Sequence, residues 1–322
     1  MTILITGVAG FIGSQVARAL LARGEDVVGV DNFSPFYDPV LKFARLKPLR
    51  EGSGFTFIEA DIADREAMLA LPDQHRGIDR IIHLAAQPSV RHAVVDPFIY
   101  AHTNVMGHLV VLELAHRLSG LKHFLYASSS SVYGGNHKLP FSVADRVDHP
   151  VSLYAASKRS GELLSETYAH LYRLKATGLR YFTVYGPWGR PDMSPYIFAK
   201  AIHEGSTVTL FHLGFVKRDF SYIDDIVAGT LLALDKPAAE PGHRLFNLGA
   251  AQAEDIVKVV ELFEKAIGKK AIVELKPGDP GDMLETAADI TETTREFGWT
   301  PRVSVEEGIP KYVEWFKSYY RI

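Results

Sequence analysis

A tyrosine and a lysine stand four residues apart, at positions 154 and 158, in a stretch with helical character. On a helix this spacing places both side chains on one face, one turn apart. An ammonium beside a phenol favours the phenolate and lowers the pKa by roughly one to three units, from about 10 for an ordinary tyrosine. Tyr154 with Lys158 can therefore act as a base near neutral pH. The same spacing also occurs where both side chains only face solvent, so the rest of the chain must decide.

A glycine-rich turn near the N-terminus predicts a dinucleotide site. Residues 3–5 form an apolar run typical of a buried parallel strand, Gly7, Gly10 and Gly13 follow, and residues 14–23 are helix-like. Glycines let the backbone approach a pyrophosphate, and a helix N-terminus offers free N–H groups. A second strand, 27–31, ends in Asp31, which suits a ribose diol and would repel a 2′-phosphate, so NAD is favoured over NADP. The glycine spacing is G-x-x-G-x-x-G, not G-x-G-x-x-G.

Further strands alternate with helices along the first part of the chain. We expect them at residues 55–59, 80–84, 124–127 and 178–182, with a helix of about twenty residues over 97–118 and the helix of Tyr154 starting near Ser152. This alternation predicts a doubly wound, Rossmann-type parallel sheet with right-handed crossovers.

Several candidate residues follow the ends of these strands, where ligands bind in such sheets. Asp61 is a candidate for the adenine, or alternatively the N-cap of a helix from residue 65. The small Ala85 and Ala86 would let the backbone lie against a cofactor. The four serines 128–131 either cap a turn or place a hydroxyl beside Tyr154. A serine, a lysine-tuned phenol and NAD form a unit that removes a hydroxyl proton while hydride leaves the same carbon.

The residue pattern of the sequence changes after Tyr185. Residues 186–191 are turn-rich, 217–225 form a polar and aromatic cluster before another helix, and 245–249 look like a strand able to rejoin the sheet. We therefore expect an NAD-binding domain over residues 1–185, with part of 215–250 crossing back to it, and a smaller α/β substrate lobe over 186–322.

The composition excludes several classes of protein. Of 322 residues, 47% are hydrophobic and 23% charged, as in ordinary globular proteins. The net charge of −3 argues against a general nucleic-acid binder. The absence of cysteine excludes disulfides, thiolate catalysis and Cys-based metal sites, and we expect no metal. Neither a signal peptide nor an apolar run long enough for a bilayer is visible, so we expect a cytoplasmic protein.

Taken together, these motifs resemble those of the extended short-chain dehydrogenase/reductases that act on nucleotide sugars. The resemblance covers essentially the whole chain and includes the loop 6–13, Asp31, the segment 128–134, Tyr154 with Lys158, and residues 181–187. Within that family the chain is most similar to the UDP-glucuronate 4-epimerases, through residues 32–39, 131–136, 186–193 and 217–220. Most of these motifs are shared among relatives with different sugars.

The resemblance implies a mechanism. Tyr154 would take the proton of the sugar 4-hydroxyl, Lys158 would hold the phenolate and the nicotinamide ribose, and Ser129 would bridge substrate and Tyr154. The 4-hydride would move to NAD and return to the other face of the 4-keto sugar after that sugar turns over. Such a 4-keto uronate is a β-keto acid and can lose carbon dioxide. Hydroxyl donors that fix its carboxylate, such as Ser130, Ser131 and Thr183, would prevent this.

The resemblance also implies the binding residues and the partners. The NAD-binding residues would be Gly7, Gly10, Phe11, Ile12, Gly13, Asp31, Asn32, Asp61, Ile62, Leu84, Ala85, Ala86, Asn104, Tyr154, Lys158 and Tyr181. The substrate-binding residues would be Gln87, Ser129, Ser130, Ser131, Thr183, Arg190, Arg218 and Asp282, with the arginines near the sugar and the diphosphate. The partner would be a UDP-sugar, UDP-glucuronate or UDP-galacturonate. We also expect a homodimer, formed through the strips 97–118 and 151–174.

Other activities remain open. A UDP-glucuronate decarboxylase shares the first half-reaction, and a UDP-glucose/galactose 4-epimerase fits if the arginines serve only the diphosphate. A dTDP-sugar 4,6-dehydratase would need an acid and a carboxylate after the catalytic hydroxyl, where this chain has Ser130 and Ser131. A non-catalytic NAD-binding sensor is disfavoured because Ser129, Tyr154 and Lys158 are all present.

Overall fold

The computed structural model describes residues 2–278 and 283–322, and its chain divides into two compact units. The first unit contains the chain up to Gly134, then Arg146–Arg180 and Val227–Phe246. The second contains Gly135–Asp145, Tyr181–Ile226 and Asn247–Ile322. Each unit is therefore assembled from separate stretches of chain. No helix in the described ranges is long and apolar enough to cross a membrane.

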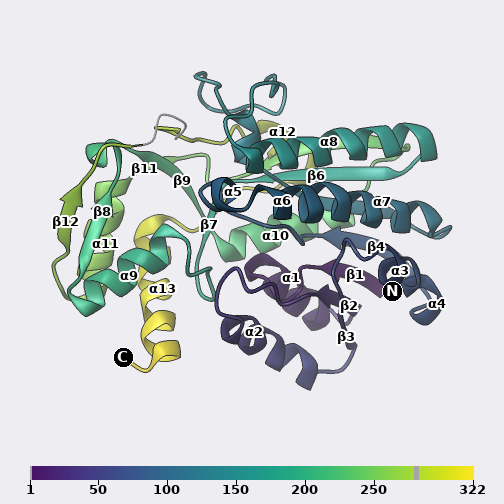
Figure 1. Ribbon diagram of the computed structural model, residues 1–322, viewed down its shortest axis with the longest axis horizontal. Coiled ribbons are helices and arrows are strands. Elements are labelled where there is room, and N and C mark those ends of the chain that lie inside the picture. Colours follow the sequence, from purple (N-terminus) through teal and green to yellow (C-terminus); the bar gives the residue numbers. More distant parts are fainter. Residues whose placement is uncertain (1, 279–282) are drawn as a thin grey trace. The chain divides into compact units, whose positions relative to one another are not determined.

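A seven-stranded sheet forms the centre of the first unit, in the order β10-β6-β5-β4-β1-β2-β3 (Figure 1). The strands are β1 Thr2–Thr6, β2 Asp26–Asp31, β3 Phe55–Glu59, β4 Ile78–His83, β5 His123–Ser129, β6 Lys175–Tyr181 and β10 Gly242–Leu248. The pairs from β3 through β5 are parallel and in continuous register apart from one irregularity at the start of β1. The Rossmann-type sheet predicted from the sequence is thus confirmed.

Helices connect these strands. They are α1 Phe11–Ala22, α2 Val40–Glu51, α3 Arg65–Leu69, α4 Leu71–Gln74, α5 His92–Val95, α6 Pro97–Tyr100, the π-helix η1 Ala101–Gly107, α7 His108–Arg117, the 3-10 turn η2 Ser130–Tyr133, α8 Leu153–Tyr172 and α10 Ile223–Asp235, whose first turn belongs to the second unit. Helices α7 and α8 pack side by side (Figure 1). Leu4, Ile81 and Phe124 of the sheet share one apolar core with residues of α3, α7 and α8.

Helix α8 begins where its sequence predicts. The Ser152 side chain accepts a hydrogen bond from the Ala155 amide, which satisfies one of the N–H groups that a helix start leaves unpaired. The helix then runs for 20 residues and ends at Arg173 in the left-handed conformation. Tyr154 therefore lies in the first turn of α8 and Lys158 in the second.

The helix expected over residues 97–118 is not a continuous α-helix. Its middle, Ala101–Gly107, is π-helical, between the short α6 and α7. The turn places Gly107 against Ile62, where an added Cβ would come within 2.7 Å of the isoleucine side chain. A wider turn that carries the predicted Asn104 is typical of functional sites.

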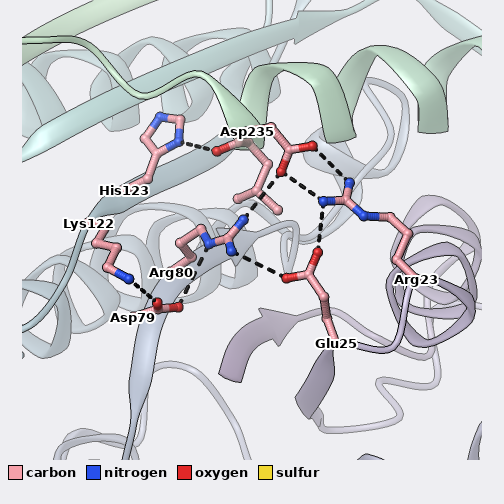
Figure 2. A network of polar contacts seen from close by, with 8 residues as sticks. Arg23, Glu25, Asp79, Arg80, Lys122, His123 and Asp235 are labelled. Carbon is pink, nitrogen blue, oxygen red and sulfur yellow. Dashed lines mark hydrogen bonds and ion pairs between the residues drawn. The ribbon is translucent and has the colours of Figure 1, made fainter. Parts of the chain in front are cut away.

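Charged side chains, of which Glu25 and Arg80 are buried, join the amino ends of several strands to the end of α10 (Figure 2). Arg80 on β4 pairs with Glu25 at 3.3 Å and with Asp235 at 3.3 Å. Arg23 contacts the same two carboxylates, at 2.8 Å and 2.9 Å. His123 at the start of β5 lies against the Leu234 carbonyl oxygen at 3.1 Å. This amino-end network lies at the opposite ends of the strands from Asp31 and Ser129.

The second unit contains two smaller sheets. One has the order β11-β9-β7, with β9 Lys217–Tyr222 parallel to β7 Thr183–Tyr185 and antiparallel to β11 Ala253–Asp255. The other pairs β8 Thr207–Leu210 with β12 Ile272–Leu275 in parallel. The helical elements are α9 Ser194–Glu204, the turn η3 His212–Gly214, α11 Ile256–Ile267, α12 Thr291–Phe297 and α13 Val305–Tyr320. Aromatic side chains, including Phe263 and Tyr312, pack between α9, α11 and α13.

Candidate active site

The turn after β1 has no room for side chains at its glycines. Gly7 has φ +74°, and a Cβ there would lie 2.7 Å from the Ala85 amide nitrogen; a Cβ on Gly13 would lie 2.2 Å from the Gly7 carbonyl oxygen. Gly10 is the N-cap of α1, and no side chain caps that helix. The start of α1 thus presents backbone N–H groups beside a bare backbone turn, as a pyrophosphate site requires.

Asp31 ends β2 and is buried beside this turn. Its Oδ2 accepts a hydrogen bond from the Ala9 amide at 3.0 Å, and its Oδ1 accepts one from the Phe33 amide at 2.9 Å. The Nζ of Lys42 lies 3.7 Å from Oδ1. Loss of hydration lowers the pKa of Lys42, although the Asp31 charge opposes this. The carboxylate is therefore held at the end of the strand by two amides and one cation.

Asn32 and Asp61 come together from neighbouring strands. The Asn32 amide donates to Asp61 Oδ2 at 3.0 Å, and the Ala63 amide donates to Oδ1 at 2.8 Å. The N-cap of the following helix is Asp64, whose side chain accepts from two helix amides. Asp61 is therefore not that N-cap, and its side chain sits at the carboxyl end of the sheet with Asn32.

Asn104 links three segments of the first unit. Its Oδ1 accepts from the Gln87 amide at 2.7 Å, and its Nδ2 donates to the Gln87 carbonyl at 3.0 Å and to Ser157 Oγ at 2.9 Å. The π-helical turn thus fixes the loop after β4 to α8. Leu84 and Ala85 in that loop donate backbone hydrogen bonds to Thr6 at the end of β1. These hydrogen bonds connect four segments: the end of β1, the loop after β4, the π-helical turn and α8.

Tyr154 and Lys158 lie on one face of α8. The Tyr154 ring packs edge-on against Tyr100, with centroids 6.2 Å apart, and the Tyr100 hydroxyl donates to backbone carbonyls of the loop after β4. The Lys158 ammonium donates to the Ala127 carbonyl of β5 at 3.0 Å. Loss of hydration lowers the pKa of Lys158 to about 8, against the raising effect of Glu162. A lysine with this pKa is mainly protonated at pH 7 and can stabilise a phenolate.

The serine segment lies where β5 ends. Ser129 is buried, and its Oγ accepts a hydrogen bond from the Ser131 amide at 3.2 Å, which starts the turn η2. Ser130 and Ser131 occupy that turn and are partly exposed. The segment therefore uses one serine as a cap, as the alternative interpretation expects, and still places hydroxyls at the carboxyl end of the sheet.

Three predicted substrate residues lie in the second unit. Thr183 begins β7 and pairs with Phe220 of β9. Arg190 is held in two-point contact by Asp192, at 2.9 Å from Nε and 2.6 Å from Nη2. Arg218 on β9 donates to the backbone carbonyls of Lys217 and Leu284. Tyr181, predicted for NAD, ends β6 and is buried in this unit, and Asp282 lies outside the described residues.

Two charged residues next to the candidate site, Glu162 and Lys42, are not part of any motif recognised in the sequence. Ser128 precedes Ser129 and donates to Glu162 at 2.6 Å, and Glu162 follows Lys158 by one turn of α8. An acid among the small side chains of the inner face of this helix is the signal that could have revealed Glu162. Lys42, beside Asp31, is the second such group.

The comparisons with known proteins agree with these observations. The model of the NAD dependent epimerase/dehydratase family matches residues 3–249. The chain is 43% identical over 336 residues to UDP-glucuronate 4-epimerase 4 of Arabidopsis thaliana, which covers 99% of this chain and 76% of that protein.

Solved structures agree as well. UDP-glucuronic acid 4-epimerase from Bacillus cereus, in complex with UDP-glucuronic acid and NAD, matches with a TM-score of 0.90 and 35% identity over 99% of this chain and 100% of that one. UDP-glucose 4-epimerase of Thermotoga maritima with UDP-glucose matches with a TM-score of 0.89 and 34% identity, over 99% and 100% of the two chains. With its glycine turn, its Asp31 and its Tyr154–Lys158 helix, the chain belongs to the NAD-dependent epimerase/dehydratase family.

Proposed function

We propose that this protein converts UDP-glucuronate to UDP-galacturonate by NAD-dependent epimerisation at C4, through a transient 4-keto sugar. One observation supports this most directly: the identity with UDP-glucuronate 4-epimerases extends over nearly the whole chain, and the chain carries Ser129, Tyr154 and Lys158 in the described arrangement. Family membership alone would leave the sugar open. The higher identity, 43% with a UDP-glucuronate 4-epimerase against 34% with a UDP-glucose 4-epimerase, favours the uronate.

The first unit supplies the proton chemistry. Tyr154, as the phenolate, removes the proton of the 4-hydroxyl, and it returns that proton when the carbonyl is reduced again. Lys158 stabilises the phenolate by its charge, since its ammonium is fixed on the Ala127 carbonyl. Ser129 donates to the developing oxygen from the end of β5. Proton transfer by a positioned group of suitable pKa contributes typically about 10²–10⁴-fold to rate.

The chain fits NAD at the carboxyl end of the large sheet. The crowded glycines 7 and 13 leave only backbone beside the uncapped start of α1, which suits the pyrophosphate. Asp31 would hold the adenosine ribose, and Asn32 with Asp61 would border the adenine. Phe11, Ile12, Ile62, Leu84, Ala86, Asn104 and Tyr181 are proposed to complete the site. When bound, NAD supplies the acceptor and the donor of the C4 hydride.

The residues proposed to bind the sugar nucleotide are those that the family resemblance implies. Gln87 and the serines 129–131 belong to the first unit, and Thr183, Arg190 and Arg218 to the second. An arginine fork matches two oxygens of a carboxylate or a phosphate. Asp192 already occupies the Arg190 fork with that geometry. Substrate would therefore share or replace this carboxylate partner.

Two further properties belong to the proposal. The strips 97–118 and 151–174 would form a homodimer, because exposed apolar side chains, including Phe98 and Leu163, lie on them. A cytoplasmic location is proposed as well, in keeping with the expectation from the sequence.

The deciding experiment identifies the product made from UDP-glucuronate without added NAD. Because the hydride returns to the sugar, NAD that remains bound is not consumed, and we expect UDP-galacturonate with inverted C4 configuration in the proton NMR spectrum. UDP-pentose with release of carbon dioxide would instead establish a decarboxylase. Turnover of UDP-glucose in place of UDP-glucuronate would establish the neutral-sugar epimerase.

A single variant separates an enzyme from an NAD-binding sensor. Tyr154→Phe keeps the ring against Tyr100 and removes the acid–base group. We expect kcat to fall by about 10²–10⁴-fold with little change in folding. Tyr172→Phe, near the end of the same helix, is the matched control. Full turnover by Tyr154→Phe would contradict the proposed base.

A further inference from the structure

The buried carboxylate of Glu162 sits one helical turn beyond Lys158 and has no contact with solvent. Its Oε1 accepts hydrogen bonds from Ser128 Oγ at 2.6 Å and from Arg180 Nε at 2.8 Å. Its Oε2 accepts from Arg180 Nη2 at 2.9 Å and from Arg159 Nη1 at 3.0 Å. Both oxygens are therefore fully used, and all donors come from the first unit.

These contacts tie α8 to the last residues of β5. Lys158 donates to the carbonyl of Ala127, and Glu162 accepts from the hydroxyl of Ser128. The next residue, Ser129, is the proposed catalytic hydroxyl. Two successive turns of the helix, at Lys158 and Glu162, are thus joined directly to two consecutive residues of the strand.

Arg180 holds Glu162 from the other side. It is 1% exposed, lies on β6 and places its guanidinium 4.8 Å from the centre of the Tyr133 ring. Tyr133 ends the turn η2 that contains Ser130 and Ser131. The same ion pair therefore supports the serine segment at its start, through Ser128, and at its end, through Tyr133.

We propose that Glu162, held by Arg180, is a positioning residue that fixes Ser129 relative to Tyr154 and keeps Lys158 charged. The catalytic effect of Glu162 rests on the proposed function. Its effect on the charge of Lys158 does not depend on which substrate the protein uses. A buried ion pair contributes uncertain stability, because desolvation offsets the attraction. The position of Glu162 on the helix of Tyr154 and Lys158, and its hydrogen bond to β5, favour a role in geometry and charge.

The charges around Lys158 make Glu162 the buried counter-charge. Arg159 and Glu166 lie on α8, Arg180 on β6, His83 on β4, His108 on α7 and His243 on β10, with Tyr126 and Tyr133 from β5 and η2. Burial lowers the pKa values of His83 and His108, so these rings are neutral at pH 7. The Glu166 side chain is 67% exposed and contacts His243. Among these described groups, Glu162 is the carboxylate that is buried.

Glu162→Gln removes the charge and keeps the size of the side chain. The charge of Glu162, which raises the pKa of Lys158, is then lost, and we expect the pKa of Lys158 to fall by about one unit. The alkaline limb of the kcat profile should move to lower pH by the same amount. At pH 8 we expect kcat to fall by about tenfold or more, with KM within about threefold, because small displacements of catalytic groups cost large factors.

The matched control is Glu25→Gln, in the amino-end network of Figure 2. Glu25 is also buried and also pairs with two arginines, Arg23 and Arg80, at the far ends of the strands. Its loss should lower thermal stability without moving the pH profile or the Lys158 pKa. If Glu162→Gln and Glu25→Gln behave alike, the Glu162 pair is only structural and the inference is wrong.

A second variant tests the positioning separately from the charge. Ser128→Ala removes the hydroxyl that joins β5 to Glu162 and leaves the ion pair with Arg180 in place. We expect a several-fold lower kcat with an unshifted pH profile. A wild-type kcat in Ser128→Ala would overturn the positioning role, and this test holds even if Glu162→Gln does not fold.

The pKa of Lys158 can be read directly in the NAD-bound protein, by NMR titration of [ε-13C]lysine assigned through Lys158→Arg. This measurement distinguishes a failure of the proposed function from a failure of the proposed role of Glu162. If the wild-type protein leaves UDP-glucuronate unchanged, the proposed function is wrong, and a shifted Lys158 signal in Glu162→Gln would still support the inference. If the wild type epimerises and the signal does not shift, the charge role of Glu162 is wrong.

Discussion

At the scale of single residues, we propose that the preference for NAD depends on Asp31 and its surroundings. The carboxylate is fixed by the amides of Ala9 and Phe33, so its free lone pairs are already oriented for a ribose diol. Lys42 lies close by, at 3.7 Å. Removing the Asp31 charge would leave a cation where a 2′-phosphate could bind.

Asp31→Asn is therefore expected to change cofactor preference. NAD binding should weaken about tenfold, since hydrogen bonds to a charged group contribute roughly 1.5–3 kcal/mol, and NADP binding should improve. Calorimetric titration of nucleotide-free protein with each cofactor measures both effects. Asp26→Asn, at the exposed start of the same strand, is the control. Equal discrimination by Asp31→Asn and wild type would refute this role.

Thr183 is the second test at this scale. In the proposed reaction its hydroxyl helps to fix the uronate carboxylate, so that the C5–carboxylate bond stays out of line with the carbonyl π system. Thr183→Ala should raise the share of UDP-pentose about tenfold, the value of one hydrogen bond to a charged group. Mass spectrometry of the products decides, with Thr207→Ala, an exposed residue of β8, as control. An unchanged product ratio would rule the role out.

At the scale of elements, much of the fold follows from the sequence. The apolar runs 3–5, 27–31, 55–59 and 80–84 all form strands of the large sheet, because parallel strands are buried on both faces and read as continuous apolar segments. Ser152 marks the start of α8 through its capping hydroxyl. The Tyr154–Lys158 face could be predicted because helix spacing alone defines it.

Other elements could not be predicted in this way. The π-helical turn at Ala101–Gly107 has no signature in residue periodicity, since only the hydrogen-bond register differs from an α-helix. The role of Glu162 depends on Ser128 and Arg180, which approach it only after β5 and β6 pair beneath α8. The second unit is assembled from separate stretches of the chain, and only tertiary contacts bring these stretches together.

Asp219 holds loops of the second unit together. Its Oδ1 accepts from Ser221 Oγ and the Ala250 amide, and its Oδ2 from the Ala251 and Ala288 amides. Burial raises the pKa of Asp219 to about 6, against the lowering effect of these donors. The carboxylate thus anchors residues 250–251 and 288 to strand β9.

Asp219→Asn should destabilise the protein markedly. The amide places an NH₂ group against donors that need an acceptor, and each buried unsatisfied polar group costs roughly 1–3 kcal/mol. We expect a loss of about 2–4 kcal/mol in urea unfolding at pH 7.5. Asp224→Asn, on the exposed side of α10, should stay within about 0.5 kcal/mol of wild type. A loss of the same small size for both variants would contradict the anchoring role.

At the scale of the whole molecule, buried neutral histidines set the response to acid. Burial lowers the pKa of His108 to about 3 and that of His123 to about 4. In the unfolded chain both would titrate near 6.5. The unfolded state therefore binds more protons below that pH, and stability present above about pH 6.5 is lost as pH falls toward 4.

Each of these two histidines should cost about 2 kcal/mol of stability at pH 5 relative to pH 7.5. Urea unfolding at the two pH values measures the pH dependence of stability, to which these rings and other groups such as His83 contribute. His123→Gln should reduce the difference by about 2 kcal/mol, whatever its effect on absolute stability. A pH difference as large in His123→Gln as in wild type would show that this ring is not held neutral.

Oligomeric state is the second property at this scale. The proposed homodimer should sediment at twice the chain mass of 35.7 kDa. Leu163 on α8 is 52% exposed, and Leu163→Glu should yield monomers because it places a charge in the proposed interface. Leu213→Glu changes a residue of equal exposure in the second unit and should remain dimeric. A monomeric wild-type protein would exclude the dimer.

The π-helical turn also bears on how insertion or loss of one residue would change this part of the chain. A π-helical turn arises when a helix accommodates one additional residue without breaking, because the hydrogen bonds then reach five residues instead of four. Removing one residue, such as the half-exposed Met106, should let α6 and α7 fuse into one α-helix. Each residue rotates an α-helix by about 100°, so the deletion would turn Asn104 away from Gln87 and Ser157. A relative one residue shorter here would need another side chain to join its β4 loop to its catalytic helix.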